Sequence, residues 1–247
     1  MDCELYQQAE FRKAAGAEFR PGGLGLTKEL ALACDLRPNH RVLDVACGLG
    51  STASYLACRW GVQAWGLDAH PGFLEEAKRR DWEVSWVLGD AEAIPFPDAY
   101  FDAVFAECFL SAVDYRPAVL REIGRVLRPG GRLAVSDLYL RNPGTTVSFA
   151  PPSTCLAGCA DKETTEGLLR QAGFVVILWH DRSDALKVFM AELILAYGSV
   201  SSFWQASGAM KRTGGGNGFL EQLSAARPGY FMLVAEVAES ALLPSDN

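Results

Sequence analysis

The sequence predicts an α/β fold in which a parallel sheet is covered by helices on both faces. Short apolar runs alternate with segments of helical periodicity, and that alternation is typical of a parallel sheet. A glycine-containing turn joins the first of these runs to a helix. With 247 residues, the chain is long enough for one α/β domain with its own core. Strands are predicted near residues 41–46, 63–68, 84–88, 101–106, 132–138, 174–180 and 230–237.

The first strand, turn and helix indicate a nucleotide-type ligand. Val42 to Val45 is short and apolar, as in a buried parallel strand, and Gly48 and Gly50 let the following turn pass close to a bound group. A helix is predicted from Ser51 to about Trp60. The second strand ends in Asp68, about 20 residues beyond the glycines, where such folds hold the two hydroxyls of a ribose. We therefore expect a ligand that contains a ribose.

Two cofactors are compatible with this turn. Gly48 to Ala53 matches the G-x-G-x-x-G/A pattern of NAD-binding domains, which is a weak signal alone. Asp44 lies within the first strand, where a carboxylate suits an ammonium and a sulfonium better than a pyrophosphate. After the third strand, the segment from Leu88 to Pro97 places a carboxylate and apolar side chains where an adenine would lie. The sequence therefore favours S-adenosylmethionine over NAD.

Two later helices have recognisable ends. One begins with Pro117 in its first turn and stops at Pro129-Gly130-Gly131, where a further strand begins. The other is capped by Asp161 and ends at Gly173. Their apolar positions predict one face packed on the sheet.

Taken together, these motifs resemble those of class I S-adenosylmethionine-dependent methyltransferases, of the branch that includes ubiquinone/menaquinone-biosynthesis and arsenite methyltransferases. The resemblance covers roughly residues 37–180. It implies a three-layer, Rossmann-like, seven-stranded sheet of order 3-2-1-4-5-7-6, whose last strand is antiparallel, and Gly229 to Ala235 fits that strand. It also implies an enzyme that transfers a methyl group from S-adenosylmethionine to a small molecule by in-line displacement.

The resemblance further implies which residues hold the cofactor. Backbone of the turn packs against the methionine part, Asp68 binds the ribose, and Asp90 and Ala91 contact the adenine. Glu107, at the end of the fourth strand, sits where the methyl group meets its acceptor. No metal site is predicted. The predicted cofactor residues are Asp44, Ala46, Cys47, Gly48, Gly50, Asp68, Ala69, Asp90, Ala91, Glu92 and Glu107.

Three cysteines are candidate acceptor-site residues. Cys108 ends the fourth strand, and the spacing of Cys155 and Cys159 after the fifth would place both on one helical face. Their segments resemble those of arsenite methyltransferases, in which thiols at the positions of Cys108 and Cys155 hold trivalent arsenic, a soft metalloid that suits thiolates. The other expected pocket wall, Arg20 to Thr27, lacks the additional cysteine of that family. The alternatives are thiol-dependent methylation of a metalloid and three small apolar residues lining a pocket.

A helical insert, residues 183–228, separates the last two strands of the single predicted domain, residues 1–247. Because the insert begins at the edge where open α/β sheets bind ligands, we expect it to cover the acceptor side. The glycine-rich segment Thr213 to Gly218 is the expected hinge or mobile tip of the insert. The alternatives for the insert are an oligomerisation arm and plain surface decoration. The tail, residues 239–247, is predicted to be disordered. One helix of the insert carries an apolar stripe formed by Leu186, Phe189, Leu193 and Tyr197.

Composition and charge restrict the partners. The net charge is −7 and there is no Lys/Arg-rich run, which argues against nucleic acid. No apolar stretch approaches the roughly 18 residues that span a bilayer, so no membrane partner is expected. Seven scattered cysteines and the absence of a signal-like segment at Met1 to Leu5 predict a cytoplasmic protein with reduced thiols. The expected partners are a small-molecule acceptor and, as an option, a second copy of the chain in a homodimer. The remaining functional alternative is a non-catalytic, cofactor-binding regulatory protein.

Overall fold

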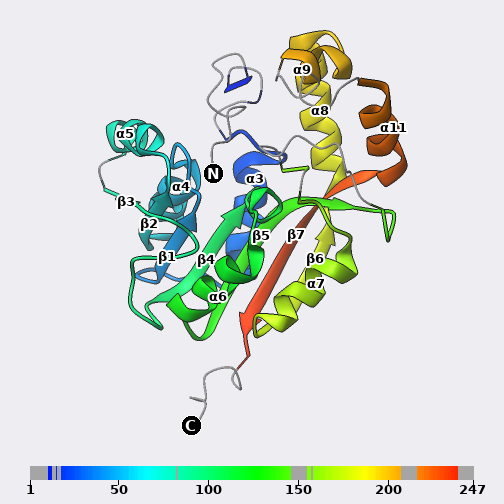
Figure 1. Cartoon of the computed structure of the whole chain (residues 1–247). Helices are drawn as coiled ribbons and strands as arrows, with labels where there is room; N and C mark the ends of the chain where they lie inside the picture. The colour runs from blue at the N-terminus through cyan, green and yellow to red at the C-terminus, as the bar shows by residue number, and fades with distance from the viewer. Residues whose placement is uncertain are drawn as a thin grey trace.

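Seven strands form one sheet in the order β3-β2-β1-β4-β5-β7-β6 in the computed structural model of the chain (Figure 1). Strand β7 is antiparallel to both of its neighbours, and the other pairs are parallel. The predicted fold class and strand order are therefore confirmed. The structure describes residues 11–12, 15, 18–81, 83–145, 155–156, 158–206 and 216–238, without the side chains of 216–220. The strands are β1 (Arg41–Val45), β2 (Gln63–Asp68), β3 (Ser85–Leu88), β4 (Phe101–Glu107), β5 (Leu127–Leu140), β6 (Phe174–Asp181) and β7 (Pro228–Val237).

Strand β5 begins five residues before its predicted start. Leu127 already pairs with Phe101, and the register then shifts so that Ala103 pairs with Arg132. The Pro129-Gly130-Gly131 segment therefore forms an irregularity within the strand instead of a loop before it. Backbone pairing with β4 on both sides of the segment explains the difference, because extra residues in one strand are absorbed by a bulge.

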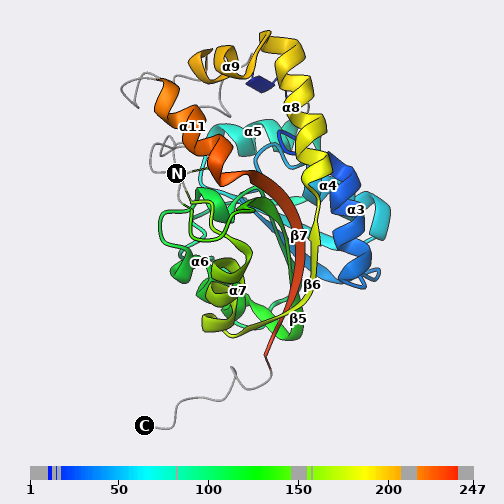
Figure 2. The ribbon, with the colours of Figure 1, turned by 90° about the vertical axis from the view of Figure 1, so that its right-hand side faces the viewer.

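Helices cover both faces of the sheet. In Figure 2, α3 and α4 lie on one side of β5, β6 and β7, and α6 and α7 lie on the other. Two clusters of buried apolar side chains fill these layers. Asp161 caps α7 as predicted, because its Oδ1 accepts the Thr164 N–H at 2.8 Å. The helices of the layers are α3 (Gly23–Ala33), α4 (Ser51–Trp60), α5 (Pro71–Arg80), α6 (Arg116–Val126) and α7 (Lys162–Gln171).

The helices of the insert gather at one end of the sheet, apart from these layers (Figures 1 and 2). They are α8 (Ser183–Tyr197), α9 (Val200–Ala206) and α11 (Gly216–Ala226). A third apolar cluster lies beneath them and includes the stripe residues Phe189, Leu193 and Tyr197. The first residues of the predicted hinge, 213–215, and the predicted disordered tail, 239–247, lie outside the described residues.

Among the described residues, no single helix is long and apolar enough to cross a membrane. Only α8 and α9 taken together pass that test of length and composition, and a bend of 73° separates them.

Candidate functional site

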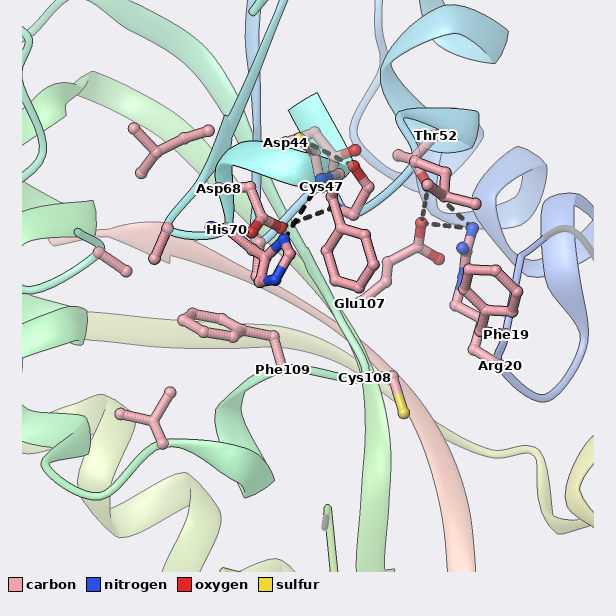
Figure 3. Close-up of a pocket in the computed structure, with 18 of the residues that line it drawn as sticks. Phe19, Arg20, Asp44, Cys47, Thr52, Asp68, His70, Glu107, Cys108 and Phe109 are labelled. Carbon is pink, nitrogen blue, oxygen red and sulfur yellow. Dashed lines mark hydrogen bonds and ion pairs between the residues drawn. The ribbon is translucent and has the colours of Figure 1, made fainter. Parts of the chain in front are cut away.

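A cavity of about 240 Å³ opens at the carboxyl ends of β1, β2 and β4 (Figure 3). Such an edge is where open α/β sheets bind their ligands. All of the predicted cofactor residues line this cofactor cavity except Gly50. The sequence therefore located the cavity, although the roles of these residues remain a prediction. The lining includes Asp44, Ala46, Cys47, Gly48, Asp68, Ala69, Asp90, Ala91, Glu92 and Glu107.

The two glycines of the turn have different roles. A Cβ at Gly50, whose φ is +80°, would lie 2.0 Å from the Trp86 ring, so this glycine lets the ring pack on the turn. Gly50 does not line the cavity, and its place against the cofactor stays a prediction. A Cβ at Gly48 would meet nothing within 4 Å, so this residue faces the open cavity. The Cys47 thiol packs over Gly66, where a Cβ would lie 2.8 Å from the sulfur.

Asp68 shapes the loop that it faces. Its Oδ2 accepts the Gly48 N–H and its Oδ1 accepts the His70 N–H, both at 2.8 Å. Burial raises the pKa of this carboxyl. A carboxylate has about four acceptor positions, so Asp68 can accept two more hydrogen bonds, as a ribose diol requires. His70 caps α5 by accepting the Phe73 N–H at Nδ1 (3.3 Å) and lines the cavity.

Asp44 is a buried carboxylate with one oxygen that lacks a hydrogen-bond partner among the described residues. Its side chain is 3% exposed, and its Oδ2 has no hydrogen-bond partner among the described residues. Burial, followed by the nearby charge of Glu107, raises the pKa of Asp44 well above its ordinary value. An unpaired buried acceptor is unfavourable unless a ligand satisfies it. A cationic group entering the cavity would do so.

The opposite wall of the cavity is a buried ion pair between Arg20 and Glu107 (Figure 3). The guanidinium Nη2 lies 2.9 Å from Glu107 Oε2, which also accepts the Thr52 hydroxyl at 2.7 Å and the Thr27 hydroxyl at 3.0 Å. Ser136 donates to Oε1 at 3.2 Å. Both carboxylate oxygens of Glu107 are thus held by hydrogen bonds to its neighbours.

Arg20 was not among the predicted site residues, although the segment that contains it was expected to form a pocket wall. Of that segment, Arg20 lines this cavity, next to Glu18 and Phe19, which precede it. The pairing of Arg20 with Glu107 joins residues 87 apart in the sequence. No local pattern marks such a pair.

Two of the three candidate thiols come together. Cys108, whose φ is +54°, has its Sγ 3.4 Å from that of Cys155. Cys159 does not join them, and the predicted shared helical face is wrong. The Cys159 N–H bonds to the Leu156 carbonyl (3.3 Å) and its thiol donates to the Cys155 carbonyl (3.1 Å). The described residues there form a turn, in which the Cys155 carbonyl accepts the Cys159 thiol and the Cys159 N–H bonds elsewhere.

A second cavity, of about 160 Å³, adjoins the first under the insert. Phe19 and Cys108 line both cavities. We call it the apolar cavity because aliphatic, aromatic and sulfur-containing side chains dominate its walls. Stripe residues Leu186, Phe189 and Leu193 of α8 point into it, and α9 and the Cys155 segment complete the walls.

Comparison with known proteins identifies the family. Residues 43–135 match a family model described as a methyltransferase domain. An O-methyltransferase of Aspergillus nomiae, rstn1, is 32% identical over 174 residues, which are 64% of this chain and 75% of that protein. The chain belongs to the class I S-adenosylmethionine-dependent methyltransferases. The NAD-dependent alternative is thereby set aside.

Other methyltransferases are similar to this one over different lengths. The phosphoethanolamine N-methyltransferase of Triticum aestivum is 32% identical over 185 residues, or 70% of this chain and 35% of that protein. The chain thus spans about a third of the length of the plant relatives that it matches. A Haemonchus contortus phosphoethanolamine N-methyltransferase solved with S-adenosylmethionine has the same fold, with a TM-score of 0.72 at 19% identity over 93% of this chain and 56% of that one. The predicted ubiquinone and arsenite branch receives no support from these relatives.

Proposed function

We propose that this protein transfers a methyl group from S-adenosylmethionine to a small-molecule acceptor. The observation that carries the proposal is the unpaired, buried Asp44 carboxylate in the same cavity as Asp68. An amino-acid ammonium can pair with Asp44, and a ribose diol can donate hydrogen bonds to Asp68. S-adenosylmethionine has both groups. When bound, it supplies a sulfonium methyl group for in-line displacement by a nucleophile.

The residues of the site have separate tasks in this proposal. Asp44 holds the ammonium group of the cofactor. Arg20, the cation on the opposite wall, faces the carboxylate group of the cofactor. The segment from Asp90 to Glu92 borders the adenine. Glu107 keeps Arg20 in place, since its carboxylate is bonded to the guanidinium. The chain has to orient the reactants and exclude water, and it needs no dedicated base for an electron-rich acceptor.

Calorimetric titration with S-adenosylhomocysteine tests the proposal. Wild-type protein should bind this ligand and not NADH. Asp68→Asn should weaken binding at least tenfold, whereas Asp98→Asn, on a side chain that is 78% exposed and absent from the cavity lining, should leave it within twofold. Circular dichroism of both variants checks that they fold. If wild-type protein does not bind S-adenosylhomocysteine, the proposal is wrong.

A second candidate function, thiol-dependent methylation of arsenic or a related metalloid, is favoured by one observation. The Cys108 and Cys155 sulfurs lie 3.4 Å apart where the two cavities meet. This candidate predicts that Cys108→Ser and Cys155→Ser each abolish turnover of arsenite and leave cofactor binding intact, while Cys58→Ser, on an exposed thiol, changes neither. Full activity in both variants excludes it. Nothing in the described residues specifically favours a non-catalytic regulatory role.

A further inference from the structure

The walls of the apolar cavity are unsuited to a charged acceptor. In the described part of the chain, its lining contains neither an acidic nor a basic side chain and no side-chain amide. Moving a phosphate or an ammonium group from water into such surroundings is strongly unfavourable without a charged partner. Arg20, the guanidinium of the adjoining cavity, is already paired with Glu107.

The apolar cavity also lies where an acceptor has to be. It shares Phe19 and Cys108 with the cofactor cavity, and Cys108 directly follows Glu107 at the end of β4. A molecule that fills the apolar cavity therefore reaches the cofactor cavity past these two side chains. Empty cavities of this size with walls of leucine, isoleucine and phenylalanine bind benzene-sized molecules in other proteins.

We propose that the methyl acceptor is a lipophilic molecule whose alkyl or ring skeleton occupies the apolar cavity. Its nucleophilic atom then lies at the Phe19 and Cys108 boundary, toward the cofactor cavity. This inference depends on the proposed function, because it names the class of substrate for that methyl transfer. It separates this chain from its relatives that are named for phosphoethanolamine, a small molecule with a phosphate and an ammonium group.

The driving force for binding of such an acceptor is the removal of apolar surface from water. Phe189 and Met190 of α8, together with Phe203 of α9, line the cavity with large apolar side chains. Apolar burial is non-directional, so these walls select for lipophilicity and size more than for one functional group. The position of the nucleophile then depends on how the skeleton fills the space beside Cys108.

Toluene is a suitable probe of this cavity, used with wild-type protein saturated with S-adenosylhomocysteine. Calorimetry should show toluene binding. Met190→Trp, which fills the cavity, should lower the affinity for toluene at least tenfold. The control is Val188→Trp on the same helix, where the side chain is 62% exposed and outside the cavity lining; it should change the affinity less than twofold. Leu186→Trp fills the cavity from another position and replaces Met190→Trp if that variant does not fold.

Two results would overturn the inference. One is toluene binding that neither filling variant weakens. The other is methylation of phosphoethanolamine with a KM that Met190→Trp leaves unchanged, a result that would still support the proposed function. Failure of S-adenosylhomocysteine to bind would instead remove the proposed function and, with it, the meaning of the toluene result.

Discussion

Replacement of Asp44 by asparagine should stabilise the free protein and weaken cofactor binding. The buried carboxylate has an unpartnered Oδ2 and is repelled by Glu107. The asparagine side chain keeps an oxygen for the Ala53 N–H, the backbone donor that stabilises the carboxylate, and carries no charge to desolvate. We expect the free energy of unfolding to rise by about 1 kcal/mol, at the lower end of the cost of an unsatisfied buried group. For a chain of this length, that corresponds to an increase in Tm of about 2–4 °C.

Cofactor affinity should change in the opposite direction. A hydrogen bond to a charged group contributes about 1.5–3 kcal/mol, so loss of the Asp44 charge should raise the Kd for S-adenosylhomocysteine by about 10- to 150-fold. Because the pKa of Asp44 is raised, protonation on lowering the pH makes the wild-type side chain resemble asparagine. The affinity of wild-type protein should therefore fall as the pH is lowered, and the stability advantage of the variant should grow as the pH rises.

Scanning calorimetry without ligand and isothermal titration with S-adenosylhomocysteine measure the two effects. Asp98→Asn is the matched control, since that side chain is exposed and paired with Arg125 at the surface. A variant with lower Tm and unchanged Kd would refute the reasoning, because Asp44 would then serve the fold and not the ligand.

Three further predictions concern the glycine turn, the buried Asp137 and the Arg20–Glu107 pair. Gly50→Ala should lower the free energy of unfolding by about 3 kcal/mol, because the new Cβ overlaps the Trp86 ring and the residue must keep a left-handed backbone conformation. A urea midpoint like that of wild type would contradict this. Burial raises the pKa of Asp137 from 3.8 to about 6. The free energy of unfolding should therefore fall by up to about 3 kcal/mol as the pH rises between these values. This pH dependence should vanish in Asp137→Asn; if it persists, another group causes it. Glu107→Gln, which leaves the Arg20 cation buried without its partner, should cost about 3–5 kcal/mol in urea unfolding, and a loss below about 1 kcal/mol would show that the pair is dispensable.

The parts of the fold that the sequence predicted are those in which neighbouring residues determine the structure. Strand β1, its turn and α4 follow from an apolar run, glycines and a helix start within 20 residues, and their bounds agree with the structure to within one residue. The cap at Asp161 is equally local. The early start of β5 was missed because it depends on pairing of Leu127 with Phe101, a partner 26 residues away.

The same distinction divides the candidate site. Asp44 lies in the first predicted strand and Asp68 ends the second. These strands are neighbours in the sheet, so strand order brings the two carboxyl groups to one cavity. Arg20 reaches the cavity only through tertiary packing with Glu107. Gly48 and Gly50 are equivalent in the sequence. The structure distinguishes them, because Gly48 faces the open cavity and Gly50 packs under the Trp86 ring of β3.

The acceptor side illustrates why substrate specificity is harder to predict than the cofactor. The spacing of Cys155 and Cys159 suggested a helical pair, yet Cys155 pairs with Cys108 across 47 residues. Cys108 adopts a positive φ, which is unfavourable for a residue with a side chain and persists only where the surroundings impose it. Here the Ser136 carbonyl binds the Cys108 N–H at 2.6 Å and fixes that backbone. The strained residue is also one of the two that line both cavities. If the acceptor occupies the apolar cavity, as we propose, the end of β4 sets how it approaches the cofactor cavity. That geometry exists only once β5 and the insert have packed against the strand.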